Sequence, residues 1–77
     1  MSDLNEIIIE KIKEIAFKKV TADVDLFETG ILSSILVVDL AVELENELTI
    51  SIPFTEITVD NFRTVEKINL YLKSKIA

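Results

Sequence analysis

Two adjacent serines, Ser33 and Ser34, have the residue type and setting for chemistry in this 77-residue sequence. They follow Gly30, the only glycine, and precede the apolar run Ile35 to Val38. A glycine supports a backbone turn before a helix, and a serine at the helix start can cap it. One serine then acts as the N-cap and the other presents its hydroxyl at an exposed helix end. We expect Ser34 to be the functional residue, with Ser33 as the alternative acceptor.

The composition argues against catalysis by this chain. The sequence has no cysteine and no histidine, so it lacks a thiol nucleophile, thiolate metal ligands and the usual general base for a serine. A Ser-Lys hydrolase would need a lysine near Ser34, but no Lys or Arg lies between Val20 and Phe62. Asp23 and Asp25 resemble the start of a calcium loop, but Glu28 occupies the position that requires glycine. We therefore expect no enzyme and no metal site.

Charge is distributed unevenly along the chain, whose net charge is −6. Between Val20 and Phe62 there are nine acids and no base, whereas the flanks hold five acids and eight bases. A surface of one sign repels nucleic acid and favours basic protein partners, although it can also serve solubility alone. We expect protein partners and no nucleic acid.

Length and hydropathy predict one small domain, residues 1–77, with an aliphatic core. No apolar run approaches the ~20 residues of a membrane span, and the N-terminus lacks a signal pattern. We expect a cytoplasmic monomer without membrane insertion.

Apolar periodicity predicts an all-α fold. A first helix is expected from a cap at Asp3 to the region of Lys18 and Lys19, and an ordered loop from Val20 to Leu32. The segment Leu48 to Phe54 is expected to be extended and to cover the end of the core. A short helical turn within Thr55–Asn61 is expected to bury Ile57, Val59 and Phe62. The last helix is expected to be capped by Thr64 and to direct these side chains inward: Val65, Ile68, Leu72 and Ile76.

The predicted helix from Ser34 to Leu48 has two apolar stripes. One has the spacing of a core face: Val37, Leu40, Ala41, Leu44 and Leu48. The second stripe has acids around it, which is typical of a docking surface with a charged rim. The candidate docking residues are Ile35, Val38, Asp39, Val42, Glu43 and Glu45. The alternative is that a small bundle covers this helix on two sides.

These features together resemble the acyl carrier protein family, which includes peptidyl and D-alanyl carriers. The resemblance covers nearly the whole chain and rests on Leu26-Phe27, Gly30, Ser34-Ile35, the acid-rich run Asp39 to Glu47, Ile52-Pro53, Thr64-Val65 and Tyr71. It implies a four-helix bundle with a long first loop and a short third helix. It also implies 4′-phosphopantetheine, taken from coenzyme A and esterified to Ser34 in this sequence.

The resemblance implies three kinds of partner: a phosphopantetheinyl transferase, an acyl- or aminoacyl-loading enzyme, and downstream transferases or synthases. The family usually has Asp where Ser33 stands. The pathway stays open among fatty acid, polyketide, peptide and D-alanyl transfer. A second hypothesis is an unmodified helical adaptor that binds partners through the same acidic and apolar face.

Overall fold

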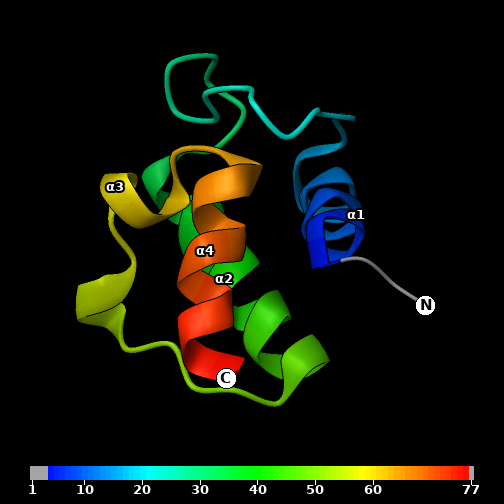
Figure 1. Cartoon of the computed structure of the whole chain (residues 1–77). Helices are drawn as coiled ribbons and strands as arrows, with labels where there is room; N and C mark the ends of the chain where they lie inside the picture. Colours follow the sequence, from blue (N-terminus) through cyan, green and yellow to red (C-terminus); the bar gives the residue numbers. More distant parts are fainter. Residues whose placement is uncertain (1–3, 77) are drawn as a thin grey trace.

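The computed structural model describes residues 4–76, which form helices and loops without a β-strand (Figure 1). The elements in chain order are α1 (Leu4–Ala16), α2 (Ser34–Leu48), the 3₁₀ helix η1 (Phe54–Glu56), α3 (Val59–Phe62) and α4 (Val65–Ile76). This arrangement confirms the predicted all-α bundle with a long first loop and a short third helix. The expected cap at Asp3 lies outside the described residues.

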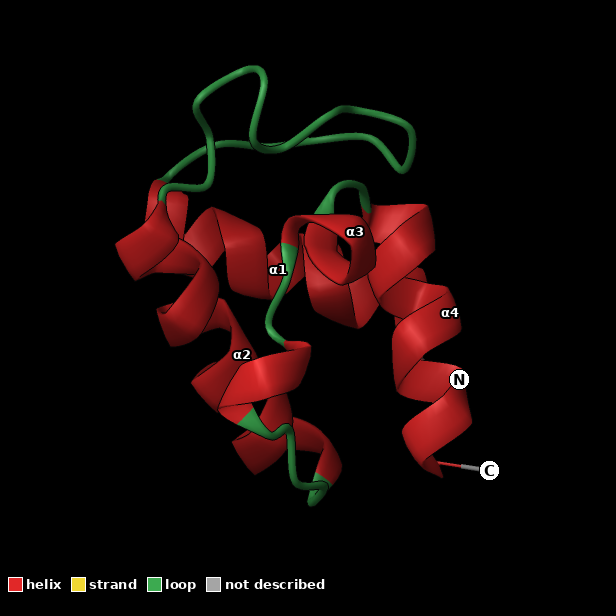
Figure 2. Cartoon of the chain, turned by 90° about the vertical axis from the view of Figure 1, so that its left-hand side faces the viewer, coloured by secondary structure: helices red, strands yellow, loops and turns green. Residues whose placement is uncertain are grey.

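The loop between α1 and α2 arches over one end of the helices (Figure 2). Backbone hydrogen bonds attach it to the start of α4: Leu26 N–H donates to the Arg63 carbonyl at 2.7 Å, and Glu66 N–H donates to the Ala22 carbonyl at 3.2 Å. Leu26 and Leu32 are buried beneath it. The prediction of an ordered loop held by its apolar side chains is therefore confirmed.

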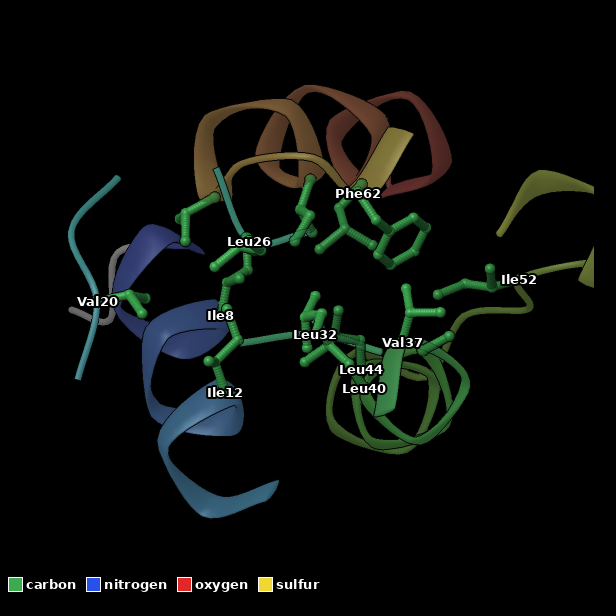
Figure 3. Close-up of a cluster of buried hydrophobic side chains, with 14 residues drawn as sticks. Ile8, Ile12, Val20, Leu26, Leu32, Val37, Leu40, Leu44, Ile52 and Phe62 are labelled. Carbon is green, nitrogen blue, oxygen red and sulfur yellow. The ribbon is translucent and has the colours of Figure 1, made fainter. Parts of the chain in front are cut away.

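The core lies between α1, α2 and α4 (Figure 3), and the loop contributes Val20, Leu26 and Leu32 to it. Its buried members are Ile8, Ile12, Val20, Leu26, Leu32, Val37, Leu40, Ala41, Leu44, Ile52, Phe62, Val65, Ile68 and Leu72. Four of the five residues predicted for the core face of α2 are among them, and Leu48 is half-buried. This packing decides which side of α2 is left for other contacts.

The first helix ends earlier than predicted, at Ala16. Phe17 adopts a left-handed backbone with φ 58°, and its N–H donates to the Lys13 carbonyl at 2.9 Å. A left-handed residue ends a helix whatever the charge that follows it. Lys18 and Lys19 therefore lie in the loop, and their assignment to the last turn of the helix was wrong.

Three apolar side chains expected inside are exposed: Phe54, Val59 and Ile76. The helical turn expected within Thr55–Asn61 is divided between η1 and α3, because Ile57 ends η1 and Thr58 caps α3. Phe62 faces the core as expected, and Ile57 is half-buried. Thr64 accepts a hydrogen bond from Lys67 N–H at 3.1 Å, which agrees with its predicted role as the cap of α4.

No helix among the described residues combines the length and the apolar character needed to cross a membrane.

Candidate functional site

The two serines have different roles at the start of α2. Ser33 is the N-cap: its backbone is extended, with φ −96° and ψ 176°, and its Oγ accepts a hydrogen bond from Leu36 N–H at 3.2 Å. The Ser33 carbonyl accepts the first helical bond, from Val37 N–H at 2.9 Å. Ser34 is the first helical residue and is exposed. The Ser33 oxygen is thus engaged in the helix end, while the Ser34 hydroxyl faces solvent.

Gly30 has a positive φ of 78° in the turn that leads to this helix. Its N–H donates to the Phe27 carbonyl at 3.0 Å, and two residues later Leu32 N–H donates to the Leu26 carbonyl at 2.8 Å. No atom lies within 4 Å of the place where a Cβ would be. Glycine is favoured here by the backbone angle rather than by lack of space.

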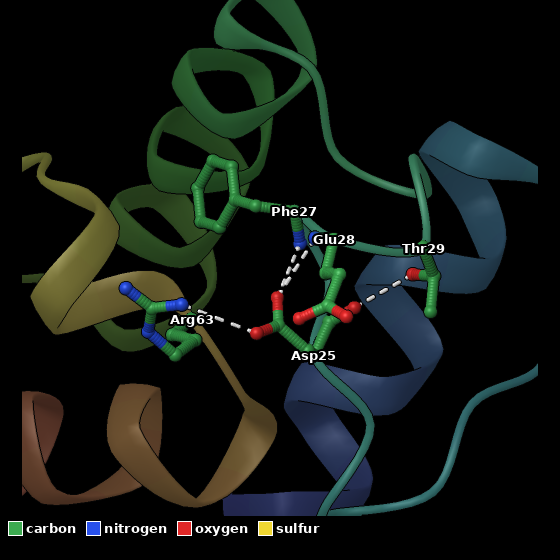
Figure 4. Close-up of polar contacts among 5 residues, drawn as sticks. All are labelled: Asp25, Phe27, Glu28, Thr29 and Arg63. Atoms are coloured by element: carbon green, nitrogen blue, oxygen red, sulfur yellow. Dashed lines mark hydrogen bonds and ion pairs between the residues drawn. The ribbon is translucent and has the colours of Figure 1, made fainter.

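Asp25 organises the turn from within (Figure 4). Its Oδ1 accepts hydrogen bonds from Phe27 N–H at 3.1 Å and Glu28 N–H at 2.8 Å, and its Oδ2 accepts one from the Arg63 guanidinium at 3.2 Å. Its carbonyl accepts the Thr29 hydroxyl at 2.7 Å. The bond from Glu28 N–H, supported by Arg63, lowers the pKa of this carboxyl. Asp25 therefore joins the turn before Ser34 to Arg63, the residue that ends α3.

A hollow of about 200 Å³ opens beside Ser34. α2, η1 and α3 contribute to its walls, with Phe27 from the loop. Its lining residues are Phe27, Ser34, Val37, Val38, Phe54, Ile57, Thr58 and Val59. The hydroxyl of Ser34 thus borders a largely apolar concavity on the surface.

The second stripe of α2 is divided between solvent and this hollow. Ile35 and Val42 are 73% and 46% exposed, and Asp39 between them is exposed. Val38 is half-buried, packs partly against the core and lines the hollow. Beside Ser34 the second stripe therefore presents two apolar side chains and one acid to solvent, and one apolar side chain, Val38, to the hollow.

The acids further along α2 contact other parts of the chain. Lys11 of α1 lies 3.6 Å from Glu43 and 3.3 Å from Glu47, and the hydrogen bond with Glu47 is the main reason that the pKa of Lys11 is raised. Glu45 accepts a hydrogen bond from Ile52 N–H at 2.7 Å. Among the described residues, none forms an ion pair or hydrogen bond with the carboxylate of Asp39, the third expected docking acid.

The sequence did not identify three residues that shape this site: Asp25, which organises the turn, and Phe54 and Thr58, which line the hollow. An Asp followed within five residues by Gly is a local signal for a turn, and it could have identified Asp25. Thr58 caps α3 by accepting a hydrogen bond from Asn61 N–H at 3.2 Å. Phe54 offered no such signal, because an apolar residue after Pro53 reads equally well as core or as surface.

The geometry suits a phosphodiester at Ser34. The N–H groups of Ser34 and Ile35 precede the first i to i−4 bond of α2, so the helix itself does not use them. The first turn contains no acid, and the positive end of the helix dipole favours an anion at this position. An exposed hydroxyl at this helix end, next to a hollow, can hold a phosphorylated arm without disturbing the core.

Comparison with known proteins also indicates a phosphorylated arm on this chain. Residues 3–72 match the family model described as "Phosphopantetheine attachment site". The D-alanyl carrier proteins of Streptococcus sanguinis and Streptococcus gordonii are each 40% identical over 68 residues, and that of Streptococcus suis is 37% identical over the same length. Each alignment covers 86% of both chains. A family match over this much of the sequence shows that the chain belongs to the phosphopantetheine attachment site family, whose members are carriers with a covalently held 4′-phosphopantetheine rather than enzymes.

Proposed function

We propose that this carrier holds a D-alanyl group as a thioester on a 4′-phosphopantetheine arm attached to Ser34. One observation carries the choice of residue: the Ser34 hydroxyl is exposed at the first position of α2, whereas the Ser33 oxygen accepts the capping bond from Leu36 N–H. Moving the attachment to Ser33 would remove that cap, at a penalty of about 1 kcal/mol.

The chain's own residues bind and orient in this proposal. Ser34 Oγ forms the ester to the phosphate, and the unused N–H groups of the first turn lie next to its charge. The arm supplies a thiol, which a sequence without cysteine cannot provide. The hollow beside Ser34 offers an apolar surface to the part of the arm nearest the attachment point.

The choice of cargo follows from the relatives, which are named D-alanyl carrier proteins and align over 86% of this chain. Fatty acid, polyketide and peptide transfer are the alternatives that the proposal sets aside. A protein purified from its own host with cargo attached identifies the group by mass. Hydrolysis of the thioester and chiral analysis of the released acid should yield D-alanine; a fatty acid or a longer peptide in its place would refute the cargo assignment.

We propose as partners a phosphopantetheinyl transferase, a loading enzyme and a downstream acyltransferase, all met in the cytoplasm. Their docking surface would be the exposed part of α2 around Ile35, Val38, Asp39 and Val42. Glu43 and Glu45 would form its more distant rim, each with a carboxylate already in contact with Lys11 or Ile52. An exposed apolar centre with an acidic rim fits a partner with a basic rim.

The attachment site is tested by intact-mass measurement after incubation with coenzyme A and a broad-specificity phosphopantetheinyl transferase. The wild-type chain should gain the mass of one 4′-phosphopantetheine, and Ser34→Ala should gain none. Because Ser34 is exposed, the substitution should change the free energy of unfolding by less than about 0.5 kcal/mol.

Ser33→Ala is the matched control. It should still be modified, but it should lose about 1 kcal/mol of stability because the cap is removed. Modification of Ser34→Ala, with loss of modification in Ser33→Ala, would transfer the site to Ser33. A wild-type chain that gains no mass would favour the unmodified adaptor.

A further inference from the structure

The segment from Thr49 to Thr58, which connects α2 to α3, forms one wall of the hollow beside Ser34. Phe54, the first residue of η1, lines that hollow and is 77% exposed. Val59, the first residue of α3, lines it from the same side and is also exposed. The position of η1 thus determines the shape of the surface across from α2.

η1 has little packing of its own. It contains three residues, none of them buried, and its N-cap Pro53 provides no side-chain hydrogen bond. Local backbone bonds join Glu56 N–H to the Pro53 carbonyl at 2.9 Å and Ile57 N–H to the Phe54 carbonyl at 3.0 Å. These bonds set the shape of the turn, but they do not fix its place relative to the bundle. That attachment must come from contacts with other elements.

Two kinds of contact supply this attachment: the half-buried Ile57, directly after η1, packs against the core, and Glu56 makes polar contacts with α3 and α4. Its Oε1 accepts a hydrogen bond from the Tyr71 hydroxyl at 2.5 Å and lies 2.8 Å from Lys75 Nζ. Its carbonyl accepts a hydrogen bond from Asn61 Nδ2 at 2.9 Å. The contact with Lys75, followed by that with Tyr71, lowers the pKa of the Glu56 carboxyl. We call Glu56, Asn61, Tyr71 and Lys75 the Glu56 clasp.

The α4 side of the Glu56 clasp is itself held in place. The Tyr71 ring lies 5.7 Å from the ring of Phe62, which is fully buried, and Lys75 Nζ lies 5.8 Å above the Tyr71 ring. A hydroxyl on a ring packed against the core has little freedom to move. Its hydrogen bond to Glu56 therefore holds η1 in place relative to the core.

We propose that Glu56 is a positioning residue that, through Tyr71 and Lys75, holds Phe54 at the edge of the hollow beside Ser34. A transferase or loading enzyme then meets a surface with two preformed sides, α2 on one and Phe54 on the other. The proposal rests on the function proposed above, since it assumes that such enzymes reach Ser34. Glu56 touches neither Ser34 nor the hollow, and acts only through Phe54.

The test compares the kinetics of modification by a phosphopantetheinyl transferase, with the carrier as the varied substrate. Glu56→Ala and Phe54→Ala should each raise KM for the carrier by about threefold to tenfold and leave kcat within about twofold. The double variant should have the KM of Phe54→Ala alone, because Glu56 is proposed to act through that side chain. Glu66→Ala, an exposed acid at the start of α4, is the matched control and should change neither quantity.

Tyr71→Phe removes one hydrogen bond of the Glu56 clasp and keeps the ring, so it provides a second variant if Glu56→Ala folds poorly. It should raise KM in the same direction by a smaller factor. An unchanged KM with a lowered melting temperature would show that the Glu56 clasp serves stability alone and would overturn the proposal. Additive increases of KM in the double variant would overturn it as well.

A measurement without any enzyme separates this proposal from the function on which it rests. In NMR spectra of the unmodified chain, the methyl signals of Val38 and Val59 should shift in Glu56→Ala and Tyr71→Phe but not in Glu66→Ala. If these signals stay in place, the positioning role of Glu56 fails even when Ser34 is modified. If they shift while the wild-type chain gains no arm, the proposed function fails and the effect of Glu56 on the hollow remains.

Discussion

The two halves of α2 have similar residues and different surroundings. From Ser34 to Val42, the helix exposes Ile35, Asp39 and Val42 to solvent. From Glu43 to Leu48, its acids contact the rest of the chain: Lys11 lies near Glu43 and Glu47, and Glu45 accepts the Ile52 N–H. One acidic helix therefore leaves its side chains open to solvent at one end and uses its acids to hold the fold at the other.

The difference comes from which residues of other elements lie opposite each half. α1 places Lys11 against the second half, and the segment after α2 folds back so that Ile52 is buried beside it. Opposite the first half lies the hollow, whose walls carry apolar side chains and the Thr58 hydroxyl rather than a cation. Charge on a helix face indicates a partner only where the chain itself provides no counterpart.

The largest effect should distinguish the buried face of α2 from the exposed first half. Leu44 is fully buried, so Leu44→Ala should lower the free energy of unfolding by about 2–5 kcal/mol. Ile35→Ala should change it by less than about 0.5 kcal/mol, because that side chain is mostly exposed. Urea unfolding followed by circular dichroism measures both. Equal destabilisation by the two variants would mean that Ile35 also packs against the fold.

A smaller effect should separate the acids of the two halves. Asp39→Lys should slow loading by about twofold to fivefold at low salt, with a difference that shrinks as salt is added, and should leave the melting temperature unchanged. Glu47→Lys makes the same change of charge on the same helix. It should lower the melting temperature, because Lys11 then faces another cation, and should leave loading unaffected. If both variants slow loading equally, net charge matters more than position.

The smallest effect should appear at acid pH in the turn that precedes the first half. The pKa of Asp25 is lowered from its ordinary value of 3.8, so the unfolded chain takes up a proton at higher pH than the folded chain does. Asp25 therefore stabilises the fold above its unfolded pKa, and this contribution is lost as the pH falls through the folded pKa. Asp25→Asn should have a lower melting temperature at pH 7 and a shallower fall between about pH 5 and about pH 2. Identical curves of melting temperature against pH for both proteins would show that the Asp25 carboxylate does not stabilise the turn.

Local signals predicted much of the fold. Ser33 as cap, Thr64 as cap and the bounds of α2 depend on residues within a turn of one another, and the structure has them as expected. Apolar periodicity identified the core face of α2 for the same reason. The end of α1 was predicted too late, because a left-handed phenylalanine is uncommon and no nearby glycine marks the stop.

Contacts between residues far apart in the sequence could not be predicted from local signals. Arg63 lies 38 positions after Asp25, and nothing in the spacing indicates that the two meet. The contacts of Glu56 in η1 with Tyr71 and Lys75 likewise join segments that are 15 or more residues apart. The docking surface on α2 stays a prediction, and the contacts of Glu43 and Glu45 within the chain could be found only with α1 and the segment after α2 in place.

The sequence by itself determined the family, the all-α class and the candidate serine, because residue type and short spacing carry all three. Only the tertiary structure decided which acids of α2 remain open to solvent and that a hollow lies beside Ser34. The physical reason is that ion pairs between elements and concavities depend on the relative positions of whole elements. The packing of the buried core sets those positions, and the surface residues that form the ion pairs and the hollow follow them.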